Sequence, residues 1–432
     1  MKKIALLFPG QGSQYVGMSK EICDDFAVAR QTFEEANDVL GFNLKKLCLE
    51  GSIVELTKTE NTQPALLTAS VAAFRVYMQE IGIKPHFSAG HSLGEFSALT
   101  CSNSMKFDAA LKIVRKRGIL MQQAADEGAG KMAAVRNISR KTIEEECIKI
   151  STEEQPVVVA CYNSPNQNVI SGHEDAVKKL IEKLSFLGAT VVPLNVSAAF
   201  HSPIMKQAAE NLQLELINYK YNDPEWPVVS NVTGMPYYGS SEIIDGLTKQ
   251  MTMPVRWQES VEYINSQGVE AVIELGPKDV LKKLMKEIAG DVSSFLLNVK
   301  EDVQTLREEL WYNKDNKDFE RQTKMKIISK CIASVICTRN RNWDASEYNS
   351  GVVEPYRKIK EMYENLQNEL KTPSDSQVRR AIQMLKTALV TKRVPESQQC
   401  KILKNISDQA EELFTLNEIN DCLIDKKNEE IA

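Results

Sequence analysis

The sequence lacks the patterns that hold a metal ion or a disulfide framework. Its nine cysteines are odd in number and scattered, and no two of them form a C-x-x-C pair. Only four histidines are present, and they do not cluster with other metal-ligating residues. These absences argue against a structural metal site and favour reduced thiols in a cytoplasmic protein.

Long apolar runs and an excess of positive charge are also missing. The start, MKKIALLFPGQGSQ, has an apolar stretch too short for the core of a signal peptide, and no later segment is apolar enough to span a bilayer. The net charge of −5 argues against non-specific nucleic-acid binding. We therefore expect a protein that binds neither membranes nor nucleic acid, and we take it to be a monomer.

Glycine becomes scarce after residue 300. Of the 20 glycines in the chain, Gly351 alone lies beyond that point. Since tight turns depend on glycine, the first 300 residues are typical of α/β structure, and the remainder is typical of a helical, turn-poor region. Within that remainder, helices are expected at roughly 318–339, 354–371, 375–392 and 397–414, after a polar linker candidate, NKDNKDFERQ, at 313–322. In the first 300 residues, strands are expected at Ile4–Phe8, WPVVSN and AVIELG, and helices at 20–40 and 64–82.

The elements expected between residues 128 and 197 indicate a smaller inserted domain. Strand-like KMAAVR, a helix at 140–150, strand-like VVVACYN and NVISG, a helix at 174–187 and strand-like TVVPLNV follow one another. This βαββαβ order is the ferredoxin-like arrangement. We predict an α/β domain over 1–127 and 198–305, the insertion at 128–197, a linker at 306–322 and a helical region at 323–432.

One serine has the surroundings of an enzymatic nucleophile. Strand-like HFSAG leads into Gly90-His91-Ser92-Leu93-Gly94, and a helix-compatible segment, LGEFSALTC, follows. G-x-S-x-G at a strand-to-helix turn is the setting of a nucleophile elbow, although the same pattern also occurs in ordinary surface turns. The Leu93 N–H would then face a developing oxyanion, and the glycine-rich turn around Gln11 is suited to supply a second donor.

A serine nucleophile needs a base, and the chain offers four histidines. The side chain of His91 should diverge from its neighbour Ser92, and His86 and His173 lie at element edges. His201 follows a strand and a short loop in the large domain, so it is the best candidate. Most acids between Ser92 and His201 fall in the insertion. The third member of a triad therefore stays open, with a backbone carbonyl as the alternative.

Arg117 interrupts the apolar face of an expected helix. A buried guanidinium requires a partner, because an unpaired buried charge is costly. That partner is either an internal carboxylate or the carboxylate of a substrate. The apolar face on which Arg117 falls consists, at helical spacing, of Phe107, Ala110, Leu111, Val114 and Met121.

Together these segments resemble the malonyl-CoA:acyl-carrier-protein transacylases. The resemblance covers about residues 1–300 and is carried by GQGSQ, GHSLGE, VRKRGILMQ, NSPNQNVISG, AFHSPIM, QMTMPVRWQESVE and IELGPKDVL. It implies an α/β-hydrolase-like core with a ferredoxin-like insertion, no bound cofactor, and two partners, malonyl-CoA and a phosphopantetheinylated acyl carrier protein. ACYNSPNQNVISG, LNVSAAFHSPIM and the helical tail are more narrowly similar to stand-alone, trans-acting malonyl transferases of polyketide and iturin-type lipopeptide assembly lines.

The resemblance also implies catalytic roles for the matching residues. Ser92 would carry the acyl group, and His201 would be its base. The N–H groups of Gln11 and Leu93 would form the oxyanion hole. The backbone carbonyl of Gln250 would hold the His201 ring, which would explain why no acid is evident.

For the substrate, the resemblance implies that Arg117 binds the malonyl carboxylate. Leu93 after the serine and Phe200 before the histidine are similar to malonyl-type rather than methylmalonyl-type sequences. The other residues expected around the substrate are Gln63, His91, Met121, Phe200 and Asn163.

The expected activity is therefore ping-pong transfer of malonyl from malonyl-CoA to a carrier-protein thiol through Ser92. The alternative is a proofreading acyl-thioester hydrolase on the same core, which Arg117 disfavours because a proofreader meets uncharged acyl chains. A non-catalytic docking protein is disfavoured for the first 300 residues by their complete set of site residues. For the tail, docking is the leading interpretation, against plain structural packing.

Overall fold

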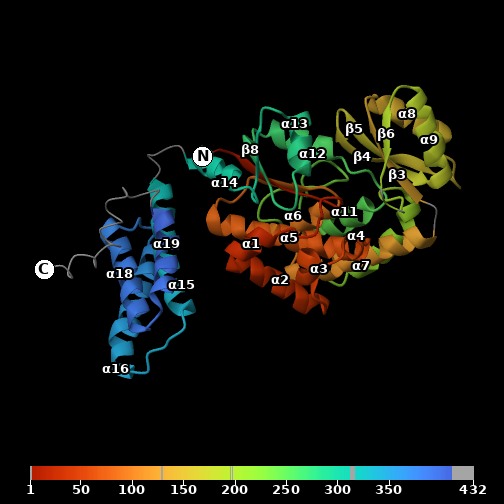
Figure 1. Ribbon diagram of the computed structural model, residues 1–432. Coiled ribbons are helices and arrows are strands. Elements are labelled where there is room, and N and C mark those ends of the chain that lie inside the picture. The colour runs from red at the N-terminus through yellow and green to blue at the C-terminus, as the bar shows by residue number, and fades with distance from the viewer. Residues whose placement is uncertain (1, 128–129, 195, 197, 312–316, 411–432) are drawn as a thin grey trace. The chain divides into compact units, whose positions relative to one another are not determined.

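The computed structural model describes residues 2–127, 130–194, 196, 198–311 and 317–410 (Figure 1). The chain divides into two compact units, residues 1–310 and 311–432. In the described part of the chain, no helix combines the length and the apolar character that crossing a bilayer requires.

A five-stranded parallel sheet forms the centre of the first unit. Its strand order is β7-β2-β1-β8-β9, and every adjacent pair is parallel. All five residues of β1 are buried, as expected for a strand covered on both faces by helices. The predicted strands are confirmed, with bounds Ile4–Phe8 (β1), Phe87–Gly90 (β2), Val228–Val229 (β7) and Ala271–Glu274 (β8); Ser293–Leu296 (β9) was not predicted.

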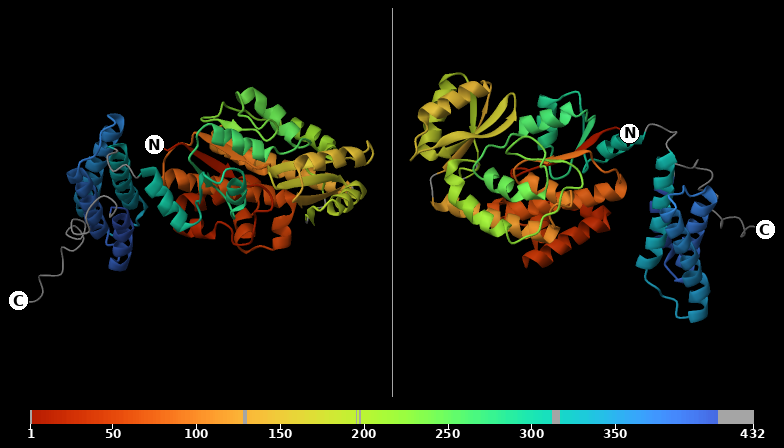
Figure 2. Two further views of the ribbon diagram at one scale, coloured as in Figure 1. Left: turned by 90° about the horizontal axis from the view of Figure 1, so that it is seen from above. Right: turned by 180° about the vertical axis from the view of Figure 1, so that it is seen from behind.

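Helices surround this sheet (Figure 2). The long helix α5 is buried over most of its length and packs against α2, α6 and α7. The bounds are Lys20–Asp25 (α1), Ala27–Leu40 (α2), Leu44–Glu50 (α3), Ile53–Thr57 (α4), Thr59–Glu80 (α5), Leu93–Cys101 (α6), Phe107–Glu127 (α7), Lys206–Leu216 (α10), Ile243–Gln250 (α11), Trp257–Ser266 (α12), Val280–Ile288 (α13) and Lys300–Trp311 (α14), with short helical turns at Pro203–Met205 (η1) and Ser240–Glu242 (η2).

Two helix predictions need correction. The helix expected over 20–40 is divided into α1 and α2 at Phe26, whose backbone is extended. The helix expected from residue 64 begins earlier, so Pro64 lies inside α5. Proline has no N–H to donate to the carbonyl of Glu60, four residues before it. Nη1 of Arg115 donates to that carbonyl instead, over 2.6 Å, and this long-range contact lets the helix start before the proline.

The smaller domain has the predicted βαββαβ order. Its antiparallel sheet has the strand order β4-β5-β3-β6, and α8 and α9 pack on one face of it around a separate apolar core (Figure 2). The bounds are Gly130–Arg136 (β3), Arg140–Ile150 (α8), Val157–Ser164 (β4), Gln167–His173 (β5), Glu174–Phe186 (α9) and Thr190–Pro193 (β6).

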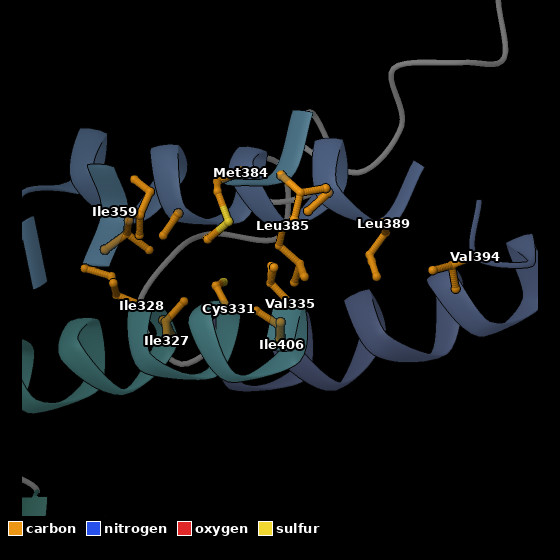
Figure 3. Packing of buried hydrophobic residues seen from close by; sticks show 14 of the residues in the cluster. Ile327, Ile328, Cys331, Val335, Ile359, Met384, Leu385, Leu389, Val394 and Ile406 are labelled. Atoms are coloured by element: carbon orange, nitrogen blue, oxygen red, sulfur yellow. The ribbon is translucent and has the colours of Figure 1, made fainter. Parts of the chain in front are cut away.

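The second unit consists of helices packed on an apolar core. Ile328, Cys331 and Val335 of α15 face Leu385 and Leu389 of α18 (Figure 3). The four long helices match the predicted ones to within a few residues over the described range. Their bounds are Lys317–Cys337 (α15), Glu354–Asn368 (α17), Asp375–Thr391 (α18) and Glu396–Ala410 (α19), with the short helices Ala345–Tyr348 (α16) and Asn349–Val353 (η3).

The linker predicted over 306–322 is helical at both ends. Helix α14 continues through residue 311, and α15 begins at residue 317. Residues 312–316 lie outside the described residues. The predicted stretch is rich in lysine, aspartate and glutamate but has no proline or glycine, and polarity alone does not interrupt a helix.

Candidate active site

Ser92 occupies a strained turn between β2 and α6. Its φ of 52° and ψ of −104° are unusual for a residue with a side chain. The flanking glycines are required by packing: a Cβ on Gly90 would lie 1.9 Å from the backbone of Gly94, and a Cβ on Gly94 would lie 1.9 Å from the carbonyl oxygen of Phe8. The two glycines therefore let the chain bend and present the Ser92 hydroxyl.

Asn231, which follows strand β7, hydrogen-bonds through its side chain to the backbone of this turn. Its Oδ1 accepts the N–H of Ser92 over 2.7 Å, and its Nδ2 donates to the carbonyl of Gly90, also over 2.7 Å. One buried side chain thus satisfies backbone groups on both sides of the bend. Sequence reasoning did not identify Asn231, for which the only signal was a polar residue at the end of a strand.

His201 lies next to the serine hydroxyl. Its Nε2 is 2.8 Å from Oγ of Ser92, and its Nδ1 is 2.7 Å from the backbone carbonyl oxygen of Gln250. Nδ1 therefore donates to the carbonyl, which leaves Nε2 as the acceptor facing the hydroxyl. Burial, together with the charge of Arg117, lowers the pKa of His201 to about 3, so the ring is neutral at pH 7 and able to accept a proton.

Arg117 is buried beside the same hydroxyl. Its Nη2 donates to Oγ of Ser92 over 3.2 Å and to Oε1 of Gln250 over 2.9 Å, while its Nε has no partner. Burial lowers the pKa of Arg117 to about 10, so the guanidinium stays charged at pH 7. It forms no ion pair with any carboxylate of the described residues. A buried cation in this state is suited to bind an anion that enters the site.

A cleft of about 320 Å³ opens onto these groups between the core and the smaller domain. His91 turns away from Ser92: its Nε2 lies 2.8 Å from Oδ1 of Asn163, on β4, and burial lowers its pKa. Of the residues singled out from the sequence, the cleft is lined by Gln11, His91, Ser92, Leu93, Arg117, Met121, Asn163, Phe200 and His201.

Two of the expected residues lie behind the cleft wall. Gln63 is fully buried and donates to the sulfur of Met121 over 3.2 Å. Gln250 is also fully buried, and its side chain lies between Arg117 and the turn of Ser92. Both residues therefore contact the lining side chains rather than the open cleft.

The two residues expected to supply backbone donors, Gln11 and Leu93, both line this cleft. Leu93 begins helix α6, so its N–H has no acceptor within the helix. Gln11 belongs to the turn after β1, and a Cβ on Gly10 would lie 2.4 Å from the carbonyl oxygen of His91. The absence of a side chain at Gly10 lets this turn approach the elbow closely.

A family described as "acyl transferase domain" matches residues 5–328. The chain belongs to this acyl transferase family. The acyl transferase is 43% identical to a malonyl CoA-acyl carrier protein transacylase of Bacillus subtilis over 94% of this chain and 100% of the relative. It is 42% identical to the protein of the same name from Escherichia coli K12, over 69% of this chain and 96% of the relative.

Solved structures of malonyl transferases also match the chain. A malonyl-transacylase in complex with its type II PKS acyl-carrier protein matches with 40% identity and a TM-score of 0.69, over 71% of this chain and 99% of that one. An acyl carrier protein S-malonyltransferase from Vibrio cholerae matches with 41% identity and a TM-score of 0.68, over 70% and 99%.

Proposed function

We propose that this acyl transferase moves a malonyl group from malonyl-CoA to the phosphopantetheine thiol of an acyl carrier protein, in trans for a polyketide or lipopeptide assembly line. The observation that carries the proposal is the unpaired guanidinium of Arg117, 3.2 Å from the hydroxyl that His201 contacts. The printed names of the relatives, which include a transacylase paired with a PKS carrier protein, support the same substrates.

The first half-reaction loads the serine. Oγ of Ser92 attacks the thioester carbonyl while Nε2 of His201 takes the hydroxyl proton. The N–H groups of Leu93 and Gln11 stabilise the oxyanion. As the C–S bond breaks, the imidazolium returns its proton to the sulfur, and CoA leaves as a thiol. The second half-reaction reverses these steps with the carrier thiol as the attacking group.

Arg117 supplies selectivity for the malonyl group. Its Nε has no partner in the described structure, so Nε and an Nη group are available for a two-pronged interaction with the carboxylate. An acetyl group has no carboxylate to offer to this guanidinium. Phe200 and Met121, both nearly buried at the cleft, limit the space beside the acyl chain.

The finer structural assignments belong to the same proposal. A nucleophile elbow directly after a strand of the parallel sheet supports an α/β-hydrolase-like core, formed by residues 1–127 and 198–305. The βαββαβ order supports a ferredoxin-like insertion at 128–197. Eight free cysteines in the described range support a cytoplasmic location. For the helices after residue 317 we propose a role in docking to the assembly line.

Intact-mass analysis tests the transfer. After mixing with malonyl-CoA, the chain should gain one malonyl group. Candidate holo carrier proteins should then remove it and gain the same mass. If malonate appears in solution at the rate at which the adduct is lost, with no gain on any carrier, the protein is a thioester hydrolase instead.

A further inference from the structure

A carboxyl group is buried directly beneath the nucleophile, and the acyl-transfer steps do not use it. Glu95 of α6 has 0% of its surface exposed. Its Oε1 accepts from the Tyr237 hydroxyl over 2.5 Å and from the Asn231 N–H over 3.3 Å, and its Oε2 accepts from Nε2 of Gln250 over 2.6 Å. Burial raises the pKa of Glu95 to about 7, although these hydrogen bonds oppose the rise.

The amide of Gln250 connects this carboxyl group to the guanidinium in the cleft. Its Nε2 donates to Glu95, and its Oε1 accepts from Nη2 of Arg117 over 2.9 Å. The carboxyl group of Glu95 and the guanidinium of Arg117 therefore do not touch, but both are hydrogen-bonded to the same neutral amide. The charge of Glu95 raises the pKa of Arg117 and so offsets part of the effect of burial.

We propose that Glu95 is the counter-charge of Arg117 in the empty site, and that Glu95 takes up a proton from solvent when a substrate carboxylate binds the guanidinium. This inference rests on malonyl as the proposed substrate. With malonyl bound and Glu95 ionised, two anions would share one buried cation. Since an uncompensated charge in a dry site is costly, the anion that can be neutralised takes a proton.

The groups that face Glu95 are compatible with its protonated form. The Tyr237 and Ser230 hydroxyls both contact it, and a hydroxyl can rotate from donor to acceptor. Burial raises the pKa of Tyr237 well above its ordinary value, so that group stays neutral. His201 is neutral because its pKa is lowered to about 3, and Arg117 is the one cation that faces this cluster within the described structure.

The consequence is a pH-dependent preference for malonyl. Below the pKa of Glu95 in the empty site, the carboxyl group is already protonated, and malonyl binding needs no proton. Above that pKa, binding must be accompanied by proton uptake, so the apparent affinity for malonyl falls up to about tenfold per pH unit. Acetyl-CoA brings no carboxylate, so its loading should not show this dependence.

A proton-uptake measurement tests the inference directly. Loading converts a thioester and an alcohol into an ester and a thiol, so the chemistry itself consumes no proton. In a weakly buffered indicator solution at pH 7.5, one round of loading from malonyl-CoA should take up a substantial fraction of a proton per chain. Loading from acetyl-CoA is the matched control, and it corrects for ionisation of the released thiol.

Two variants identify the carboxyl group that takes up the proton. Glu95→Gln keeps the shape of the neutral acid and should abolish the excess uptake and make the malonyl KM independent of pH. Glu274→Gln is the matched control, because Glu274 is another buried carboxyl group with a pKa raised to about 7, bound to the N–H groups of Leu281 and Lys282. This variant should retain both effects.

Equal proton uptake from the two acyl-CoA substrates would overturn the inference, as would a pH dependence that survives in Glu95→Gln. If Glu95→Gln does not fold, Tyr237→Phe takes its place, because it removes a hydrogen-bond donor to the ionised carboxyl group of Glu95. The midpoint of the pH dependence of the malonyl KM should then move upward. An unmoved midpoint counts against the inference. If Ser92 gains no acyl group at all, the proposed function fails rather than the role of Glu95.

Discussion

The two units of the chain are built on different principles. In the first, buried polar groups gather around Ser92, and both Ser92 and His201 have a positive φ. In the second, the core cluster is apolar (Figure 3). Gly351, the one glycine of that unit, lets η3 approach Thr391 of α18.

The described part of the helical unit also has positive φ values, at Leu370 and Arg393, and it buries Lys324 and Lys392. The difference is that its core cluster is apolar, whereas the buried polar groups of the first unit gather where the chemistry is proposed.

The relatives differ in whether their similarity extends into the second unit. The Escherichia coli transacylase is covered almost completely by 69% of this chain. The Bacillus subtilis match extends over 404 residues, which is more than the 310 residues of the first unit, so it must include part of the helical unit. The helical unit is thus an addition that some members of the family share, and its role can be tested separately from acyl loading.

The largest effect is expected at the nucleophile. Ser92→Ala should reduce the rate of malonyl adduct formation by about 10³-fold or more, since it removes the hydroxyl proposed to carry the acyl group. Intact mass after incubation with malonyl-CoA measures it. Ser350→Ala, an exposed serine of the second unit, is the control and should load normally. Adduct formation by Ser92→Ala at a near-normal rate would mean that the nucleophile lies elsewhere.

Arg117→Ala should change selectivity more than overall transfer. Loss of a charged pair worth roughly 2–3 kcal/mol lowers malonyl loading about 30- to 160-fold, while acetyl loading holds or rises. Competition between the two acyl-CoA substrates measures the ratio. Lys116→Ala, which removes an exposed charge on the same helix, is the control. An equal fall for both substrates would identify Arg117 as a structural residue.

Removing the second unit should separate loading from delivery. A chain ending after Trp311 keeps α14 and should fold, load malonyl normally, and lose about tenfold in transfer to its cognate carrier, the equivalent of about 1.4 kcal/mol of docking free energy. Thermal melting checks the fold. If the shortened chain aggregates, the helices are structural; undiminished transfer to the cognate carrier contradicts docking.

A point variant tests docking in the full-length chain. Trp343 is 94% exposed on the second unit, and tryptophan is enriched among residues that dominate binding energy. Trp343→Ala should reduce transfer to the cognate carrier several-fold without affecting loading. Leu370→Ala, which removes another exposed apolar side chain of the same unit, should leave transfer unchanged.

The smallest effect concerns stability alone. A Cβ on Gly351 would lie 2.3 Å from Oγ1 of Thr391, so Gly351→Ala should destabilise the helical unit by about 1–3 kcal/mol. Thermal unfolding should show this while malonyl loading stays normal. Adding Thr391→Ala removes the clash and should restore part of the stability. A parallel loss of loading would show that the two units do not behave independently.

The secondary-structure elements that depend on neighbouring residues were predictable from residue patterns. Strand β1, the order of elements in the insertion and the long helices of the tail follow from periodicity and glycine placement. The strand-to-helix turn at Ser92 and the position of Arg117 on an apolar face were also evident. Residue patterns failed where long-range contacts decide the structure. Arg115 lets α5 begin before Pro64, and the position of Asn231 after a strand did not indicate that its side chain binds the turn of Ser92.

The sequence by itself determined which residues bear chemistry, because a turn, a cap or a helical stripe depends on neighbours within a few positions. Only the tertiary structure decided which of them meet. Ser92 and His201 are 109 positions apart, and Gln250 follows His201 by 49 more. The parallel order β7-β2-β1-β8-β9 places the ends of distant strands side by side, and no local period encodes that order. Burial of Glu95 and Arg117 at either end of the Gln250 amide follows from this packing, and it sets their charges.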